Sequence, residues 1–183
     1  MKRKRSDECR LRLLLQKCIH DAHAAGLPVV AANVAPNVKL NHRRDCIGLC
    51  RRTVDDADVE RFTILFSDFY LALDDDEIGN VLMHELIHTL PDCWDHGVSF
   101  RKWMALVNDH GYAVEVSNRG DRAAKLRAVC EAALLADGPR WVTVGCDHGC
   151  RINVSCRSRV ARHPEYFECN AHHDELKLIR RNK

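Results

Sequence analysis

The sequence lacks any apolar run approaching the roughly 20 residues that a membrane-spanning helix needs. Glycine and proline are also scarce, at 9 and 5 of 183 residues, and there are no repeats and no low-complexity tract. With 46% hydrophobic and 30% charged residues, the composition is that of a globular protein, one domain or a domain with a small appendage. We therefore expect a folded chain with no membrane partner.

A secretory signal is missing as well. The start, "MKRKRSDECRLRLLLQ", is basic, but its apolar stretch is short and is interrupted by Arg12. We expect residues 1–8 to be a basic, disordered terminus, with a nuclear address or a nucleic-acid arm as the alternative for the "KRKR" run. The chain is therefore placed in the cytoplasm, or with the nucleoid or nucleus if it associates with DNA.

Cysteine, in contrast, is abundant, and so is positive charge near one end. Ten cysteines in a chain without an export signal favour thiols or metal ligands over disulfides. Residues 138–183 carry nine Lys/Arg against five Asp/Glu, a net charge of +4, whereas the other residues carry 19 against 21, a net charge of −2. A basic tail on a slightly acidic body favours contact with nucleic acid.

The hydrophobic periodicity predicts an α+β fold. Helical spacing marks one helix before the β-forming segments and three after them, and a break at Asp137-Gly-Pro is the best domain boundary. The domains expected are a core at 9–137 and a basic subdomain at 138–183. The expected helices are 9–25, 74–90, 99–110 and 120–136, and the expected strands are 37–41, 46–54 and 61–70.

The helix at 74–90 carries the sequence "HELIH" from His84 to His88. Residues four apart lie on one face of a helix, so His84 and His88 can offer two imidazole nitrogens to one metal ion. Glu85 lies beside them and can act as the general base on a metal-bound water, the arrangement found in zinc proteases.

A catalytic zinc needs a third protein ligand and an open position. His96 is the preferred third ligand, because Pro91 ends the helix and lets the chain turn back. Three other residues of the same loop remain as alternatives: Asp92, Asp95 and Cys93. Cys46 and Cys50 are a further possible pair, but their place in a predicted strand favours the core.

The stretches "VLMHELIHTL" and "DHGVSFRKWMALVN" resemble the SprT-like metalloprotease family, which is related to the Spartan proteases that act on DNA–protein crosslinks. "GLCRR" (48–52) and "RFTILFS" (61–67) resemble the strands that precede the active-site helix in that family. The resemblance covers about residues 10–178. It implies a zincin-like core with a small mixed sheet, a zinc ion on His84, His88 and His96, and Glu85 as base. By the same resemblance, "GYAVEV" (111–116) is a strand, and Phe100 and Trp103 pack beneath the site.

The last segment offers a second set of metal ligands. Cys146 and Cys150 form one short-spaced pair, Cys169 and His172 form another, and the 18 residues between them could supply a β-hairpin. This is the pattern of a zinc ribbon, in which a closed four-ligand site supplies the folding energy of a small subdomain. SprT-like proteins often end in such a ribbon. His148 and His173 remain competing ligands, whereas Cys156 is not expected to be one.

The expected cofactors are thus one catalytic and one structural zinc ion, and the expected substrate is a protein. Basic residues of the ribbon could bring this protein to single-stranded or damaged DNA by binding phosphates. These residues are Arg151, Arg157, Arg159 and Arg162. Two other functions stay open. A repressor-cleaving zinc peptidase would use an acidic third ligand, and a non-catalytic nucleic-acid adaptor would not need Glu85.

Overall fold

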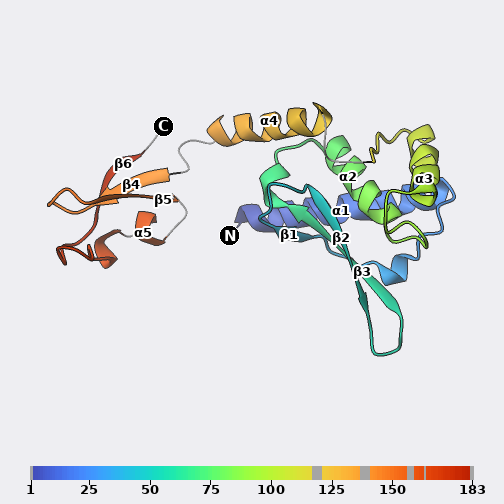
Figure 1. The fold of residues 1–183 in the computed structure, drawn as a ribbon, viewed down its shortest axis with the longest axis horizontal. Coiled ribbons are helices and arrows are strands. Elements are labelled where there is room, and N and C mark those ends of the chain that lie inside the picture. Colours follow the sequence, from blue (N-terminus) through green and yellow to red (C-terminus); the bar gives the residue numbers. More distant parts are fainter. Residues whose placement is uncertain (1, 117–120, 137–140, 156–158, 163, 182–183) are drawn as a thin grey trace. The chain divides into compact units, whose positions relative to one another are not determined.

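The computed structural model describes residues 2–116, 121–136, 141–155, 159–162 and 164–181. The chain divides into two compact units, Met1–Cys130 and Glu131–Lys183 (Figure 1). The predicted mixed α+β fold is confirmed, whereas the zincin-like assignment of the core stays a prediction. The predicted boundary at 137–139 lies outside the described residues. The elements are α1 (Lys2–Ala24), η1 (Ala31–Asn33), β1 (Lys39–Asn41), β2 (Gly48–Val54), β3 (Glu60–Ser67), η2 (Asp68–Tyr70), α2 (Asp75–Ile87), α3 (Val98–Asp109), α4 (Asp121–Ala136), β4 (Trp141–Gly145), β5 (Arg151–Ser155), α5 (Arg159–Arg162), η3 (Pro164–Tyr166) and β6 (Lys177–Arg181).

Helix α1 begins at Lys2, so the prediction of a disordered basic terminus at residues 1–8 is wrong from that residue onward. Lys and Arg are good helix formers, and once a helix exists each added residue gains a backbone hydrogen bond. The buried face of α1 consists of Leu11, Leu15, Cys18 and Ala22, spaced by four, three and four residues. Burial of each leucine stabilises the fold by about 1.5–3 kcal/mol, which anchors the helix to the core.

The first unit contains a small mixed sheet with strand order β1-β3-β2. β1 pairs with β3 in parallel, and β2 pairs with β3 antiparallel with Gly48 opposite Phe66 and Val54 opposite Glu60. Phe62, Ile64 and Phe66 of β3 are buried, as their alternation predicts. Because β2 stands at one end of this order, one of its backbone edges is available to the cleft described below.

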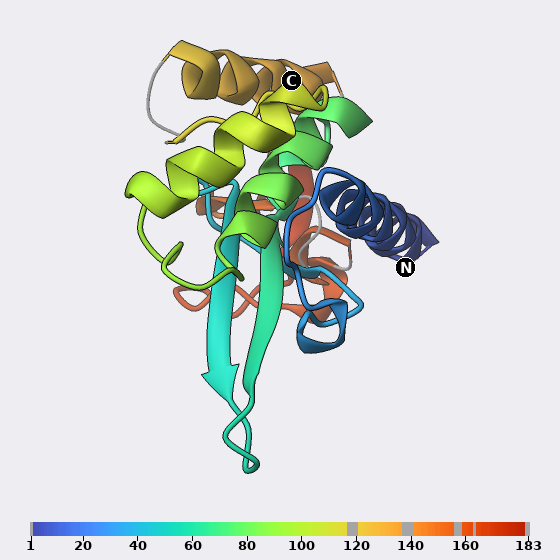
Figure 2. The same cartoon turned by 90° about the vertical axis from the view of Figure 1, so that its right-hand side faces the viewer.

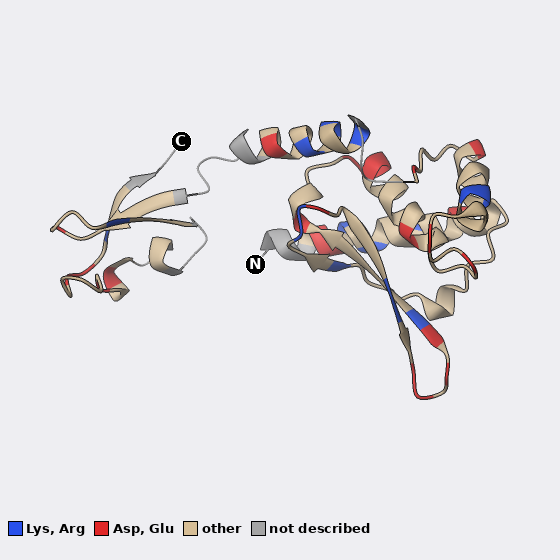
Figure 3. Cartoon of the chain, in the orientation of Figure 1, with Lys and Arg blue, Asp and Glu red and all other residues tan. Residues whose placement is uncertain are grey.

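The β2–β3 hairpin projects beyond the helices, and acidic residues gather at its turn (Figures 2 and 3). Residues 51–54 of β2 are exposed, whereas the opposite end of the strand is buried. Asp55 closes the turn by accepting hydrogen bonds from the backbone N–H groups of Ala57 and Val59. Asp58 adopts a φ of 62°, a left-handed conformation that Asp tolerates better than most residues.

Helix α2 carries the His84–His88 motif and lies against the sheet, with α1 and α3 beside it (Figure 2). Its start is fixed by Asp74, whose carboxylate accepts from the Glu77 backbone N–H at 2.8 Å, and by acidic residues in the first turn. Residues on several faces of the helix are buried, including Ile78, Val81 and Met83. His84 and His88 therefore stand on, and at the end of, a well-packed core helix.

Arg10 ties α1 to the start of α2. Its guanidinium donates to the carbonyls of Leu71 and Leu73 at 2.9 and 2.8 Å, and to the Asp75 carboxylate at 2.7 Å. One side chain thus satisfies two carbonyls in the segment that precedes α2.

We expect Arg10→Ala to lower the free energy of unfolding by about 1–3 kcal/mol, because it leaves these acceptors without a charged donor. Arg12→Ala, on the exposed side of the same helix, is the matched control and should change stability little. Urea denaturation of the two variants measures the difference. Equal stability of both variants would contradict the proposed role of Arg10.

The second unit is built on a three-stranded sheet with order β5-β4-β6, both pairs antiparallel. Its core consists of Val142, Val144, Cys146, Cys169 and Leu176. The hairpin predicted between the two ligand pairs is wrong: β5 pairs with β4, which precedes Cys146, and the chain after β5 forms the helical turns α5 and η3. The reason is that the Cys146–Cys150 segment is itself the hairpin turn, closed by the Cys146 N–H and the Cys150 carbonyl.

Candidate metal centre and catalytic cleft

Three histidines from two segments of the first unit converge on one point. The Nε2 atom of His84 lies 3.2 Å from Nε2 of His88 and 3.1 Å from Nε2 of His96. The structure therefore brings His96, and not the alternatives from its loop, to the His84–His88 pair. Cys93 is buried, and the Asp95 carboxylate accepts from the Gly97 backbone N–H at 3.0 Å.

The other ring nitrogens are oriented by backbone carbonyls. His84 Nδ1 donates to the Glu115 carbonyl at 2.8 Å, and His88 Nδ1 donates to the Cys93 carbonyl at 2.7 Å. With the proton on Nδ1, each Nε2 keeps its lone pair for a metal ion. Burial, and next the neighbouring His88, lowers the pKa of His84 to about 4, and burial lowers the pKa of His88 and His96. All three rings are therefore neutral ligands at pH 7.

Phe100 of α3 packs against all three imidazole rings, with centroid separations of 4.7 to 4.9 Å. It is fully buried, whereas Trp103 one turn later is only half-buried. The chain reaches α3 through a turn in which Asp92 has a φ of 56°. Contact with one buried aromatic ring restricts the planes of all three imidazoles.

Glu85 lies beside the histidines and is 4% exposed. Burial raises the pKa of its carboxyl to about 8, opposed by a hydrogen bond from the Cys50 backbone N–H. A carboxylate with a raised pKa, held by one backbone donor, is suited to accept a proton from a reacting water.

Gly48 makes this position of Glu85 possible. A Cβ atom at Gly48 would lie 2.7 Å from Glu85 Oε1 and 2.7 Å from Val81 Cγ1. The only sequence signal for this role is the presence of a glycine in a predicted strand, which often marks the close approach of another group.

The histidines and Glu85 line an open cleft of about 550 Å³. Its rim includes Leu49 of β2, Val116 and Trp94, which is 52% exposed. The Arg52 guanidinium lies 5.1 Å from the Trp94 ring and joins the hairpin to the ligand loop. Of the two cysteines predicted as core, Cys50 is buried in β2, whereas Cys46 precedes the strand, is half-buried and lines the cleft.

The strand predicted at 111–116 is wrong: residues 112–115 form an extended connection whose backbone groups are bound by side chains. We call residues Ala113–Glu115 the strap. Asn80 accepts from the Ala113 N–H at 2.8 Å, and Asn108 both accepts from the Val114 N–H and donates to the Val114 carbonyl. The strap ends on the carbonyl that binds His84. The Tyr112 hydroxyl, just before the strap, donates to the carboxylate of Asp21 in α1 at 2.6 Å.

The sequence model of the SprT-like family matches residues 16–120. The chain belongs to the SprT-like family. The match covers more than half of the chain and includes β2, β3, α2, α3 and the three histidines. No curated protein and no solved structure matches the chain. SprT-like proteins are generally associated with metallopeptidase activity. Among the helices that the structure describes, none is long and apolar enough to cross a membrane.

The second unit lies beyond the SprT-like match and holds another cluster of potential ligands. His172 Nδ1 lies 3.6, 3.4 and 3.7 Å from the sulfur atoms of Cys146, Cys150 and Cys169, respectively. The four ligand atoms lie within 4.8 Å of one another, which is compatible with one zinc ion in a closed site. The Ala171 backbone N–H lowers the pKa of the Cys169 thiol, which favours the thiolate that binds metal.

The competing histidines occupy other positions. His148 stacks on the His172 ring with a centroid separation of 4.7 Å, and its Nδ1 lies 2.5 Å from the Asp174 carboxylate. His148 and Asp174 can also share a metal with Cys146, so they remain an alternative ligand set. His173 is exposed and has a φ of 58°, which turns the chain after the ligand pair.

The four arginines predicted to contact nucleic acid are described to different extents. Arg151 begins β5 and is exposed. In the sheet, Gly145 of β4 is the register partner of Arg151 on one side and of Lys177 of β6 on the other. Lys177 is exposed and forms an ion pair with Asp147 at 2.6 Å. Arg157 lies outside the described residues. Arg159 and Arg162 belong to α5, and their side chains lie outside the described part of the structure.

Proposed function

We propose that this chain is a zinc-dependent endopeptidase with His84, His88 and His96 as the ligands of the catalytic ion. The observation that carries the proposal is the convergence of three neutral imidazole Nε2 atoms beside the buried Glu85 carboxylate at the floor of an open cleft. Three nitrogen ligands with the fourth side left to a cleft suit a catalytic rather than a structural ion. The zincin-like assignment of the core belongs to this proposal.

The chain's own groups have distinct tasks in the reaction. When bound, zinc would polarise the peptide carbonyl and make water acidic enough to attack it near neutral pH. Glu85 takes the proton of the attacking water and passes it to the leaving amine. The edge of β2 that faces away from β3 lines the cleft at Gly48 and Cys50, and it offers an extended peptide those backbone groups that are not already bound, since the Cys50 N–H is held by Glu85.

We further propose that the protein substrate is bound or crosslinked to DNA, in the cytoplasm or with the nucleoid or nucleus, and that the second unit binds the DNA. The support is the net charge of +4 over residues 138–183 and the exposed Arg151. Phosphate binding of this kind is independent of base sequence and weakens as salt rises. A structural zinc ion on Cys146, Cys150, Cys169 and His172 would hold the sheet that presents Arg151.

Cleavage of a histone, with and without single-stranded DNA, tests both proposals. We expect Glu85→Gln to reduce cleavage about 10²- to 10⁴-fold, because the base is lost while the zinc ligands remain. Glu8→Gln, an exposed carboxylate of α1, is the matched control and should cleave as wild type does. Zinc content, measured by atomic absorption, should be the same in all three proteins.

The comparison of cleavage with and without DNA separates the two proposals. Cleavage that requires DNA and falls with Arg151→Ala supports action on DNA-bound proteins, whereas Glu85-dependent cleavage indifferent to DNA removes that part alone. If zinc-loaded wild type and Glu85→Gln behave alike, the peptidase assignment fails, and DNA binding by both would identify an adaptor. If His96→Ala keeps zinc and activity, an acidic residue and not His96 is the third ligand.

A further inference from the structure

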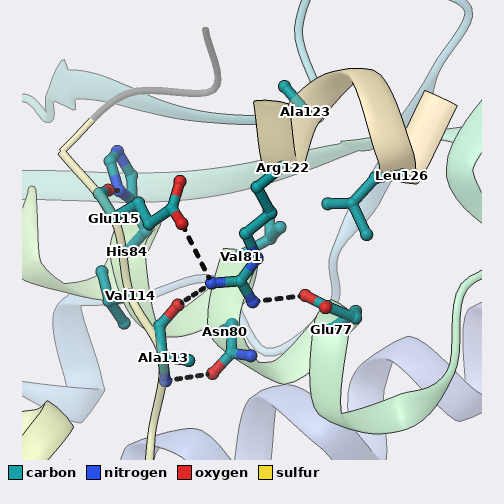
Figure 4. A pocket seen from close by; sticks show the side chains of 10 residues that line it. All are labelled: Glu77, Asn80, Val81, His84, Ala113, Val114, Glu115, Arg122, Ala123 and Leu126. Carbon is teal, nitrogen blue, oxygen red and sulfur yellow. Dashed lines mark hydrogen bonds and ion pairs between the residues drawn. The ribbon is translucent and has the colours of Figure 1, made fainter. Parts of the chain in front are cut away.

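Arg122 of α4 binds the strap. Its Nη1 donates to the Ala113 carbonyl at 2.5 Å, and its Nη2 donates to the Glu77 carboxylate of α2 at 2.5 Å (Figure 4). Nη1 also lies 3.6 Å from the Glu115 carboxylate. The guanidinium is half-buried between these groups, so it contacts both ends of the strap and the helix that carries the metal-binding motif.

The Glu115 carbonyl at the end of the strap is the acceptor of His84 Nδ1. An extended segment outside the sheets has no neighbouring strand to fix its carbonyls, so their positions depend on the side chains that bind it. Asn80 and Asn108 hold the first two residues of the strap, and Arg122 holds the Ala113 carbonyl and lies beside the Glu115 side chain. The acceptor of His88 is the Cys93 carbonyl, in a different loop.

We propose that Arg122 is a positioning residue for His84, because it fixes the strap that carries the Glu115 carbonyl. This carbonyl keeps the His84 proton on Nδ1, so that Nε2 faces the place where the three histidine Nε2 atoms converge. Such outer hydrogen bonds set the tautomer and the basicity of a metal-binding histidine. Arg122 lies beyond residues 16–120, the part of the chain that matches the SprT-like family. The inference rests on the proposed function in one respect, namely that His84 binds the ion.

The test compares Arg122→Ala with Arg127→Ala. Arg127 lies on the same helix and donates to the Arg44 carbonyl, so its removal loosens α4 without releasing the strap. In metal-free protein, ¹⁵N-detected imidazole spectra should show the Nδ1–H tautomer of His84 lost or in faster exchange in Arg122→Ala, with His88 unchanged as the internal control. Arg127→Ala should leave both rings as in wild type.

Zinc titration against a chelator, followed on the same imidazole signals, gives the second readout. We expect Arg122→Ala to raise the Kd of the three-histidine site about tenfold. Arg122→Lys keeps the charge but reaches one acceptor at a time, so it should fall between Arg122→Ala and wild type. It also carries the test should Arg122→Ala fail to fold.

The inference is overturned if Arg122→Ala and Arg122→Lys keep the wild-type His84 tautomer and zinc affinity. It is equally overturned if Arg127→Ala causes the same change, since that would reflect a general loss of α4 packing. Absence of zinc binding at the His84 and His88 signals of wild type would be a failure of the proposed function instead. The tautomer comparison would still decide whether Arg122 positions His84.

Discussion

Replacing Gly48 by alanine should reduce peptide hydrolysis at least about 100-fold, although no chemical group of the site is removed. The new Cβ would lie 2.7 Å from Glu85 Oε1 and 2.9 Å from Glu85 Cγ, so the carboxylate must move. A displacement of about 1 Å in a catalytic group can cost a factor of 10² in rate. The measurement is kcat/KM on a quenched peptide, together with zinc content, which should stay that of wild type.

The matched control for Gly48→Ala is Gly79→Ala. Gly79 lies within α2, and a Cβ there would meet nothing nearer than a Tyr112 ring carbon at 3.9 Å. Because glycine disfavours a helix interior, this variant should gain about 0.5–1 kcal/mol in stability and keep full activity. Gly48→Ala should instead lose about 1–3 kcal/mol through overpacking. Full activity of Gly48→Ala at a temperature where it is folded would show that Glu85 needs no such close approach.

Removal of one ribbon ligand should unfold the second unit and leave the first folded. In Cys169→Ser, amide hydrogens of β4 and β5 should exchange as in an unfolded chain, while those of α1 and α2 stay protected. Among the described residues of the second unit, the core holds only a few buried side chains, whereas a structural zinc site contributes on the order of 10–16 kcal/mol of apparent binding free energy. The same exchange pattern is expected when a chelator removes zinc from wild type.

His148→Ala is the control that decides between the two ligand sets of the second unit. If Cys146, Cys150, Cys169 and His172 hold the ion, His148→Ala keeps zinc and protected amides, and His172→Ala loses both. The reverse result would assign the ion to Cys146, His148 and Asp174. Protected amides in metal-free Cys169→Ser would contradict the view that zinc supplies the folding energy.

Features that depend on short sequence distances were predictable. The helix at 74–90 is encoded by an acidic cap, apolar spacing and a terminal proline, and those local signals place the His84 and His88 rings on one helical face. The ligand pairs of the second unit, Cys146 with Cys150 and Cys169 with His172, were predictable in the same way, because each pair is closely spaced in sequence. The alternation of Phe62, Ile64 and Phe66 likewise predicted a strand with one buried face.

Errors arose where a backbone group found a partner far away in sequence. "GYAVEV" was predicted to be a strand, but the strap has its hydrogen bonds satisfied by Asn80, Asn108 and Arg122. The predicted ribbon hairpin failed in the same way, because β5 pairs with a strand on the other side of Cys146. Helix α1 reached Lys2 because nothing in the basic start interrupts a helix once the buried face has anchored it.

The sequence by itself therefore determined which residue types can bind metal and on which element they stand, because periodicity and capping act over a few residues. Only the tertiary structure decided that His96 completes the cluster of histidines, that Gly48 gives room to Glu85, and that Arg122 binds the strap whose Glu115 carbonyl accepts from His84. These choices depend on distances between segments tens of residues apart. Tertiary packing fixes such distances, and they cannot be inferred from the local sequence pattern.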